Sequence, residues 1–408
     1  MKKSILKSYA KLIVRTGVAV KKGQPVLIKT NVTNEEFTAM VVEECYKAGA
    51  TKVVVEWGSE AVARVNYKHG KEKYLSQLTP MQIASQHWQN DELPCMIWLD
   101  CDDPDGMAGL DMEKVARVSS SLRKQIWPIR VLRENKYQWC IAACPSEAWA
   151  KKVFPELSKK KAVEALWAAI LECSRAADGN GIANWDVHNE NFRSKFEYLN
   201  SLDLRELKYK ASNGTDLKVG LIPNMTFLGG GENTLGGIFF QPNIPSEEVF
   251  TTPMRGVAEG IVYSSKPLSY NGVLIENFSV RFHEGKAVEV HAEKGEEALK
   301  SILTIDEGSA YLGECAFVPY ESPINQTGLL FYNTLFDENA ACHLALGRGF
   351  SNLYKDFEKY TEEELKSFGV NDSSSHVDFM IGTRDMSIIG VDANGVEHKI
   401  FENGTWAF

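Results

Sequence analysis

Short apolar runs alternate with amphipathic stretches along the first 180 residues of the chain. The apolar runs show no internal alternation, which predicts strands buried on both faces, and the stretches between them have helical spacing. Asn34 is placed to cap the first of these helices. Strands separated by helices are typical of a parallel sheet with helices on both sides. The predicted strands are 25–28, 53–55, 96–99 and 138–143, and the predicted helices are 34–49, 71–89 and one that begins at Asp111.

The pattern changes to a period of two after residue 205. Asn-Gly and Glu-Gly pairs separate these alternating segments, as they do in antiparallel hairpins. We therefore expect an α/β protein with an N-terminal doubly wound, mostly parallel domain over 1–180 and a C-terminal α+β, largely antiparallel domain over 181–408. In the second domain the predicted strands are 206–211, 217–222, 260–263, 272–278, 279–284 and 287–291, followed by a helix over 296–303.

Composition supports a folded chain of ordinary type. The 408 residues are 44% hydrophobic and 24% charged, and a chain of this length buries a large core without help from disulfides or metals. The net charge of −9, with no long basic run, argues against nucleic acid as a partner. The eight cysteines form no CxxC pairs and several lie in apolar runs, which indicates buried, reduced thiols and a cytoplasmic location.

The N-terminal segment resembles the start of a signal peptide, but basic residues interrupt its apolar positions. Ile5, Tyr9, Leu12 and Ile13 instead form the stripe of an amphipathic helix. No uncharged apolar stretch reaches the roughly 18 residues that a membrane span needs. We expect a protein that is neither exported nor bound to a membrane.

An acidic loop follows the third predicted strand, where doubly wound domains usually bind their ligands. It contains Asp100, Asp102, Asp103 and Asp105. Cation binding is one interpretation of this loop, and a solvated loop is the one we favour. No GxGxxG or GxxxxGK[ST] motif follows any strand, so a nucleotide site is not expected.

Side chains that suit a metal ion are concentrated in the C-terminal part of the chain. His376 and Asp378 are two residues apart, so on a strand both project from one face while Val377 points into the core. Glu314 lies in an apolar run, where a buried carboxylate needs a partner. Six nitrogen or oxygen donors without cysteine indicate two divalent ions, such as zinc, cobalt, manganese or magnesium. The candidates are one of Glu247 and Glu248, with Glu314, Glu338, His343, His376 and Asp378.

Each of these candidates has a purely structural alternative. Surface strands often alternate charged and apolar residues, and Glu338 can simply pair with a lysine. The Glu247–Glu248 pair can form the first turn of a helix capped by Ser246. The remaining histidines have no companion ligands, and we interpret them as ordinary surface or core residues: His69, His87, His188, His283, His291 and His398.

Four motifs in this region together resemble the thermophilic-aminopeptidase family of metallopeptidases. They are Asn243–Pro253, Leu312–Cys315, Asp337–Gly347 and Ser375–Gly382, and their order and approximate spacing match over the whole chain. The resemblance implies a cytosolic, homodimeric exopeptidase that removes N-terminal residues from peptides with two divalent metal ions. The ligands it implies are Glu248, Glu314, Glu338, His343, His376 and Asp378.

The chemistry expected from this ligand set is hydrolysis by a water activated between two metals. Glu314 is the candidate for a carboxylate shared by both ions, and Glu247 is a weak candidate for the general base. The resemblance implies Glu248 rather than Glu247 as the ligand. Because adjacent residues of an extended chain point in opposite directions, we expect only one of the two to reach the metals. One departure from the family is Phe350, which stands where a tyrosine is usual. Tyr354 is one turn away if the segment is helical, too far for a direct replacement.

Two other classes of function remain open at this point. A different dinuclear metallohydrolase, a phosphoesterase or amidohydrolase, shares the same ligand chemistry, although no phosphate cradle accompanies it. A non-catalytic metal-binding protein is the second alternative, since only an open coordination position distinguishes catalytic from structural sites.

Overall fold

The computed structural model of the chain describes residues 1–408, which form two compact units. The first unit consists of Met1–Val187 and Gly231–Pro245, and the second of His188–Gly230 and Ser246–Phe408. The hydrophobic pattern predicts a single boundary near residue 180 and does not indicate that 231–245 rejoins the first unit. A two-residue strand, β10 (Asn243–Ile244), makes this return by pairing with β4, and so short a strand has no periodicity to detect.

A five-stranded sheet forms the centre of the first unit, in the order β10-β4-β3-β1-β2. Every neighbouring pair is parallel, which confirms the predicted doubly wound domain. The strands β1 and β3 are almost entirely buried, which explains why their sequences do not alternate. The longer strands are β1 (Val26–Asn31), β2 (Val53–Gly58), β3 (Cys95–Asp100) and β4 (Trp139–Ala143), and β8 (Glu232–Asn233) and β9 (Phe239–Phe240) form a separate pair.

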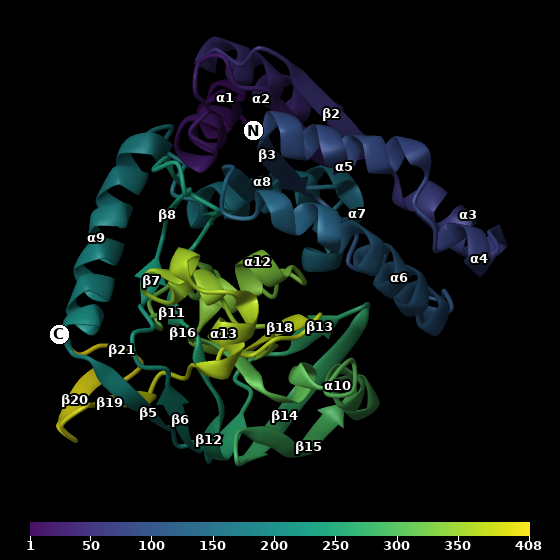
Figure 1. The fold of residues 1–408 in the computed structure, drawn as a ribbon. Helices are drawn as coiled ribbons and strands as arrows, with labels where there is room; N and C mark the ends of the chain where they lie inside the picture. The colour runs from purple at the N-terminus through teal and green to yellow at the C-terminus, as the bar shows by residue number, and fades with distance from the viewer. The chain divides into compact units, whose positions relative to one another are not determined.

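Helices cover this sheet from two sides (Figure 1). The rings of Tyr9, Phe37 and Trp167 pack together and join α1, α2 and α8. On the other side, Trp88 of α5 packs against the Leu27 cluster of the sheet. The helices are α1 (Lys3–Leu12), α2 (Glu35–Ala48), α3 (Glu60–His69), α4 (Glu72–Leu75), α5 (Pro80–Glu92), α6 (Met112–Arg130), α7 (Glu147–Val153), α8 (Lys159–Cys173) and α9 (Gly181–Ser201).

Two details of the predicted helices need correction, and one is confirmed. The single helix expected over 71–89 is divided between α4 and α5, because Thr79 and Pro80 start a new helix after α4 has ended. The side chain of Asn34 makes no capping bond, so that prediction is wrong. Instead, Asn31 accepts a hydrogen bond from the Thr33 amide at 3.2 Å. The helix predicted to begin at Asp111 is α6, and the Asp111 side chain accepts a hydrogen bond from the Lys114 amide at 3.0 Å.

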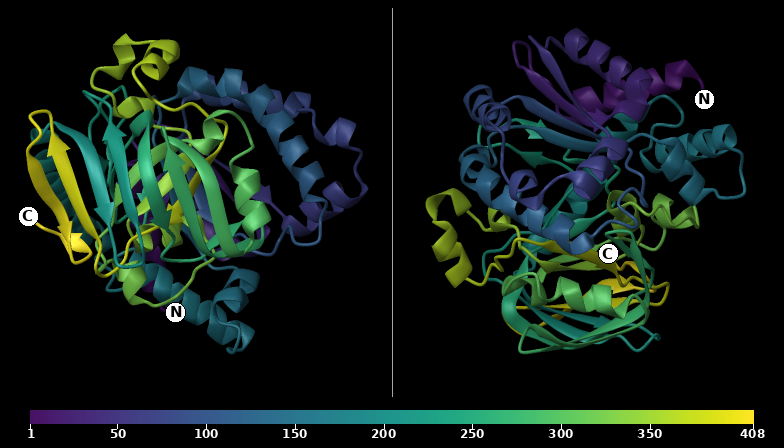
Figure 2. Two further views of the ribbon diagram at one scale, coloured as in Figure 1. Left: turned by 90° about the horizontal axis from the view of Figure 1, so that it is seen from below. Right: turned by 90° about the vertical axis from the view of Figure 1, so that its right-hand side faces the viewer.

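The second unit contains a nine-stranded antiparallel sheet in the order β13-β14-β12-β6-β5-β19-β20-β21, with β15 paired to β14. Figure 2 (left) shows strands from the teal, green and yellow parts of the chain side by side in this sheet. The two strands predicted over 272–284 form one long strand, β14, since no turn residue separates them. The bounds are β5 (Leu204–Lys210), β6 (Asp216–Leu221), β12 (Pro253–Tyr263), β13 (Leu268–Tyr270), β14 (Val273–His283), β15 (Lys286–Lys294), β19 (Ser387–Asp392), β20 (Glu397–Glu402) and β21 (Thr405–Trp406).

A second antiparallel sheet, in the order β18-β17-β16-β11-β7, packs against the large one. All residues of β16 and β17 are buried, so this sheet lies in the interior of the unit. Its strands are β7 (Leu228–Gly229), β11 (Val249–Thr251), β16 (Leu312–Phe317), β17 (His343–Gly347) and β18 (His376–Met380), and the short helices of the unit are α10 (Glu296–Ile302), α11 (Pro323–Gln326), α12 (Thr334–Asp337) and α13 (Glu362–Ser367).

Two global features bear on the predicted setting of the protein. No helix combines the length and the apolar character needed to cross a membrane. All eight cysteines are buried and none is in a disulfide, as expected for the thiols.

Candidate metal centre

One face of the inner sheet carries most of the predicted metal ligands. Along β18, His376 and Asp378 project from this face, while Val377 points the other way into the core, as predicted. The register places Ala345 of β17 between Glu314 and Asp378 in one row across three strands. This small neighbour leaves space over the face for the longer carboxylate and imidazole side chains.

The first group of donor atoms combines β16 and β17 with the segment that immediately precedes β11. The Nε2 atom of His343 lies 3.0 Å from Oε2 of Glu248, and the Glu314 carboxylate completes the group. The Nδ1 atom of His343 lies 3.1 Å from the carbonyl oxygen of Ala341, so it donates there when protonated and leaves Nε2 for the site. The ligand atoms of the three residues all lie within 4.8 Å of one another.

The second group shares Glu314 with the first. The Nε2 atom of His376 lies 3.0 Å from Oε2 of Glu314 and 3.2 Å from Oδ1 of Asp378. Its Nδ1 atom lies 2.7 Å from the carbonyl oxygen of Arg348, which orients the ring in the same way as for His343. A carbonyl partner of this kind is usual behind an imidazole that binds a metal. Glu314 is therefore the one side chain common to both groups.

Glu338 lies beside these two groups without joining either of them. It follows α12 in a short 3-10 turn, and its side chain interacts with that of Asp378 on β18. Removal from water raises the pKa of Glu338 well above its usual value, and the charges of Asp378, Glu248 and Glu314 raise it further. Glu338 therefore lies close enough to the other candidate ligands for their charges to affect its ionisation.

The buried side chains of the site carry an excess of negative charge, which favours a bound metal ion. Burial raises the pKa of Glu314 to about 7, with Glu248 and Asp378 adding to the effect. Burial lowers the pKa of His343, but the nearby carboxylates reverse this and raise it to about 9. The opposite charges that act on the carboxylates come from the two histidines. A buried cluster of this composition needs additional positive charge, which divalent ions supply.

The donor chemistry narrows the class of ion. Cys315 projects from the opposite face of β16 into the core, and Cys342 lies with Val318, so no thiolate faces the site. Carboxylate oxygens and imidazole nitrogens without sulfur suit zinc, cobalt, manganese or magnesium rather than a soft metal. The residues present therefore fit the divalent ions that the sequence predicts.

Glu247 belongs to neither of the two donor groups. Its backbone amide donates to Oδ1 of Asn339 at 2.7 Å, and its carboxylate lies 3.8 Å from Nε2 of His188. His188 also lies 2.8 Å from the carbonyl oxygen of Ser246 through the same nitrogen. The segment around Ser246 is irregular and leads into β11, so the alternative of a helix turn is wrong.

His188 is a buried histidine, and its sequence context gives no sign of companion residues. It lies on α9, packs against Phe192 with a ring distance of 4.3 Å, and contacts the only member of the Glu247–Glu248 pair that is outside the donor groups. No local motif joins His188 to a residue 59 positions later. Only the tertiary structure brings the two together.

Phe350 packs its ring against a candidate ligand. Its centroid lies 5.2 Å from that of His376 and 5.3 Å from that of Phe250. Tyr354 belongs to a different cluster, where its ring stacks on Phe368 and its hydroxyl lies 3.5 Å from the amide of Asn224. As expected, Tyr354 does not take the position of the missing tyrosine hydroxyl.

Known proteins with similar sequences are metalloproteases, in agreement with the donor groups described above. The profile of the family described as "Thermophilic metalloprotease (M29)" matches residues 2–406. Aminopeptidase AmpS of Bacillus subtilis is 38% identical over 404 residues, covering 99% of this chain and 98% of that protein. Aminopeptidase PepS of Streptococcus thermophilus is 36% identical over 406 residues, with the same coverage.

A solved structure of wild-type AmpT from Thermus thermophilus is similar over the full length of both chains, with a TM-score of 0.91 and 35% identity. This likeness confirms the predicted fold class. The family and the names of the relatives also confirm the predicted enzyme class, a metal-dependent hydrolase of peptide bonds. The chain belongs to the thermophilic metalloprotease (M29) family.

Proposed function

We propose that this protein is an aminopeptidase that uses two divalent metal ions to hydrolyse the N-terminal peptide bond of peptides. The observation that carries the two-ion part is the position of Glu314, which belongs to both groups of donor atoms. A carboxylate shared by two three-residue groups is suited to bridge two ions. The exopeptidase part rests on the relatives, which are named aminopeptidases.

The assignment of ligands follows the two groups. Glu248 and His343 would hold one ion, His376 and Asp378 the other, and Glu314 would contact both. Glu338 would complete the set, because its ionisation depends on the charges of Asp378, Glu248 and Glu314. When bound, the ions supply Lewis-acid polarisation of the scissile carbonyl and lower the pKa of water.

The chain itself contributes orientation and proton transfer. The backbone carbonyls of Ala341 and Arg348 fix the two imidazoles, so their ring nitrogens need no rearrangement during turnover. Glu247 is our candidate for the group that accepts a proton from the attacking water and returns it to the leaving amine. His188 stands 3.8 Å behind it and is positioned to stabilise its charge.

Location and assembly belong to the same proposal. The eight buried thiols are consistent with a reducing compartment, and we place the protein in the cytoplasm. The homodimer that the family resemblance implies stays a prediction. Peptides with a free N-terminus are the partners we propose, without nucleic acid or membrane.

A reporter assay on the purified protein tests this proposal. The protein should release the reporter from a leucyl amide but leave an N-acetyl-leucyl amide intact. Treatment with a chelator should abolish the activity, and zinc, cobalt or manganese should restore it at two ions per chain, measured by elemental analysis.

The other functional classes give different results in the same assay. Full activity in a demonstrably metal-free sample would remove the metal from the mechanism. Hydrolysis of a phosphate ester in place of the leucyl amide would indicate a phosphoesterase. Stoichiometric metal binding without hydrolysis of any of these substrates would leave a non-catalytic metal protein.

A further inference from the structure

A cavity in the first unit lies at the position where doubly wound domains usually bind ligands. It has a volume of about 540 Å³, within the roughly 300–1,000 Å³ typical of small-molecule sites. From β1 the chain proceeds to β2 on one side, and β3 then adds on the other side of β1. This reversal of strand order is a topological switch point, and the carboxyl ends of β1 and β3 line the cavity there.

Strand alternation places polar and aromatic side chains on the same face of the sheet. Lys29 and Trp98 are register partners on β1 and β3, and Ile141 follows in the same row on β4. Asp100 lies two residues beyond Trp98 and therefore projects from the same face. The indole rings of Trp98 and Trp139 meet edge to face, with centroids 6.3 Å apart.

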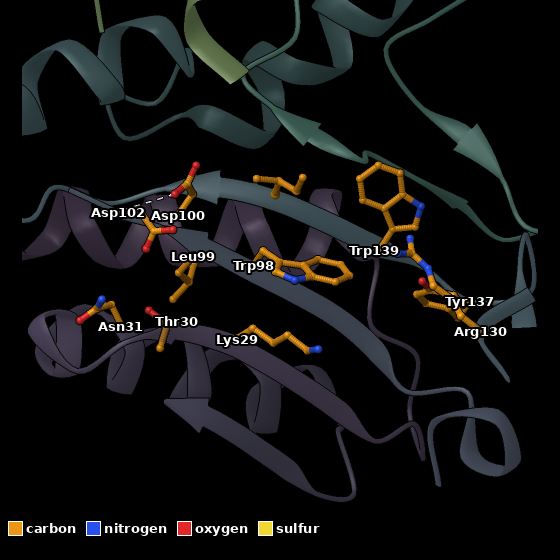
Figure 3. A pocket seen from close by; sticks show the side chains of 11 residues that line it. Lys29, Thr30, Asn31, Trp98, Leu99, Asp100, Asp102, Arg130, Tyr137 and Trp139 are labelled. Carbon is orange, nitrogen blue, oxygen red and sulfur yellow. Dashed lines mark hydrogen bonds between the residues drawn. The ribbon is translucent and has the colours of Figure 1, made fainter. Parts of the chain in front are cut away.

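The two ends of the cavity carry opposite charge. Figure 3 shows Asp100 and Asp102 at one end, Arg130 at the other, and Trp98 between them. The Lys29 ammonium lies 6.0 Å from the centroid of Trp98 and is paired with Glu56 at 3.4 Å. The cavity thus presents acid, aromatic surface and base in sequence along the strands.

Like charges lie close together at the acidic end of the cavity. Partial removal from water raises the pKa of Asp102 to about 6, and the charges of Asp100 and Glu60 contribute. Of the acidic loop that follows β3, Asp105 has a partner of its own, Lys152, at 2.8 Å. A cationic group of a ligand would relieve the repulsion between Asp100 and Asp102, whereas an anion would increase it.

We propose that this cavity is a second ligand site, which binds a zwitterionic peptide of two or three residues. The free ammonium group would lie at Asp100 and Asp102, the terminal carboxylate toward Lys29 and Arg130, and an apolar side chain against Trp98. The choice of a peptide as ligand rests on the proposed function, because trimming of longer peptides produces this class of molecule.

The spacing along the strands selects the length of the ligand. The row of Asp100 is two residues from the row of Lys29, or about 6.6 Å at the usual rise of a strand. An extended dipeptide spans roughly 7 Å and a tripeptide roughly 10 Å, whereas the charged groups of a free amino acid share one residue. Two or three residues therefore match the distance between the charged ends.

Calorimetric titration of the metal-loaded protein tests the proposal. The probe is phenylalanyl-leucine with a methylated peptide nitrogen, which keeps both charged ends and blocks hydrolysis. Asp102→Asn and Arg130→Gln should each weaken the binding to this cavity by at least about tenfold, because each removes a charge-assisted contact. Acetylation of the probe's amine or amidation of its carboxylate should have a similar effect.

Matched variants separate this cavity from the metal centre. Lys124→Gln on the exposed side of α6 and Asp91→Asn on α5 change the same charges outside the cavity and should bind the probe normally. A binding event that persists in Glu314→Gln but is lost in Asp102→Asn supports the second site. A single event that is lost in Glu314→Gln and unchanged in Asp102→Asn and Arg130→Gln overturns it. Hydrolysis of the leucyl amide is scored independently, so failure of the proposed function is recognised separately.

Discussion

The two units of this protein use sheets in different ways to gather polar groups. In the second unit, most donors project from the adjacent strands β16, β17 and β18 of a buried antiparallel sheet, with an apolar core on the opposite face. In the first unit, polar side chains lie toward the carboxyl ends of a parallel sheet and are supplemented by a helix. The first arrangement fixes atoms within hydrogen-bond distance of one another, while the second leaves space for a ligand.

This difference determines which unit suits a metal ion and which suits an organic ligand. Buried carboxylates at close range are costly without a cation. The cluster on the inner sheet is therefore stable only when metal ions or protons balance its negative charge. The cavity in the first unit has charges separated along the strands and remains partly solvated. It suits recognition of an organic zwitterion, which brings its own balanced charges.

The largest expected effect comes from removal of the shared carboxylate. Glu314→Gln should lower the metal content and reduce turnover by at least about 10²-fold, since even a change behind a metal ligand typically costs 10–100-fold. Elemental analysis and steady-state kinetics measure the two effects. The exposed Glu307→Gln, which also loses a carboxylate, is the matched control. Two bound ions and normal turnover in Glu314→Gln would rule out a bridging role.

The alternation along β18 can be tested by changing one face at a time. Val377→Ala should lower the free energy of unfolding by roughly 1–3 kcal/mol through lost core packing, without changing the metal content. Asp378→Asn should do the reverse, with reduced metal content and little loss of stability in the metal-free protein. Chemical denaturation and elemental analysis of both variants are required. If Val377→Ala lost metal as readily as Asp378→Asn, the two faces would not be functionally distinct.

A smaller change is expected at Phe350, whose ring packs on His376. Phe350→Tyr adds a hydroxyl that would donate a hydrogen bond mainly in the transition state, so turnover should rise several-fold with little change in the Michaelis constant. Kinetics on one amide substrate at equal metal occupancy measure this. Unchanged or lower turnover would favour a role in packing alone.

The smallest effect concerns the pH dependence of the proposed peptide site. The pKa of Asp102 is raised to about 6 in the folded protein, so its carboxylate is charged at pH 7 and becomes neutral as the pH falls below 6. Binding of the methylated dipeptide should therefore weaken several-fold between pH 7 and pH 5, where the peptide amine stays protonated. Asp100 and Glu60 face the same group and keep part of the charge. Titration calorimetry of Asp102→Asn over this range should show a flatter pH profile.

The sequence by itself determined the fold class and most of the candidate ligands. Unbroken apolar runs predicted the parallel strands because both faces of that sheet are covered, and alternation predicted the antiparallel hairpins because each strand has two different faces. The two-residue spacing of His376 and Asp378 was sufficient to place both on one face of a strand. Glu314 was identified because a carboxylate in an apolar run needs a partner.

Only the tertiary structure decided which of these residues meet. The register between β16, β17 and β18 brings Glu314 into both donor groups, and the contact of His188 with Glu247 joins segments that no local pattern connects. The return of residues 231–245 to the first unit depends on a strand of two residues. Local sequence specifies the periodicity of a segment, whereas pairing between distant segments depends on the packing of the whole chain, and for that reason the sites became visible only in the folded protein.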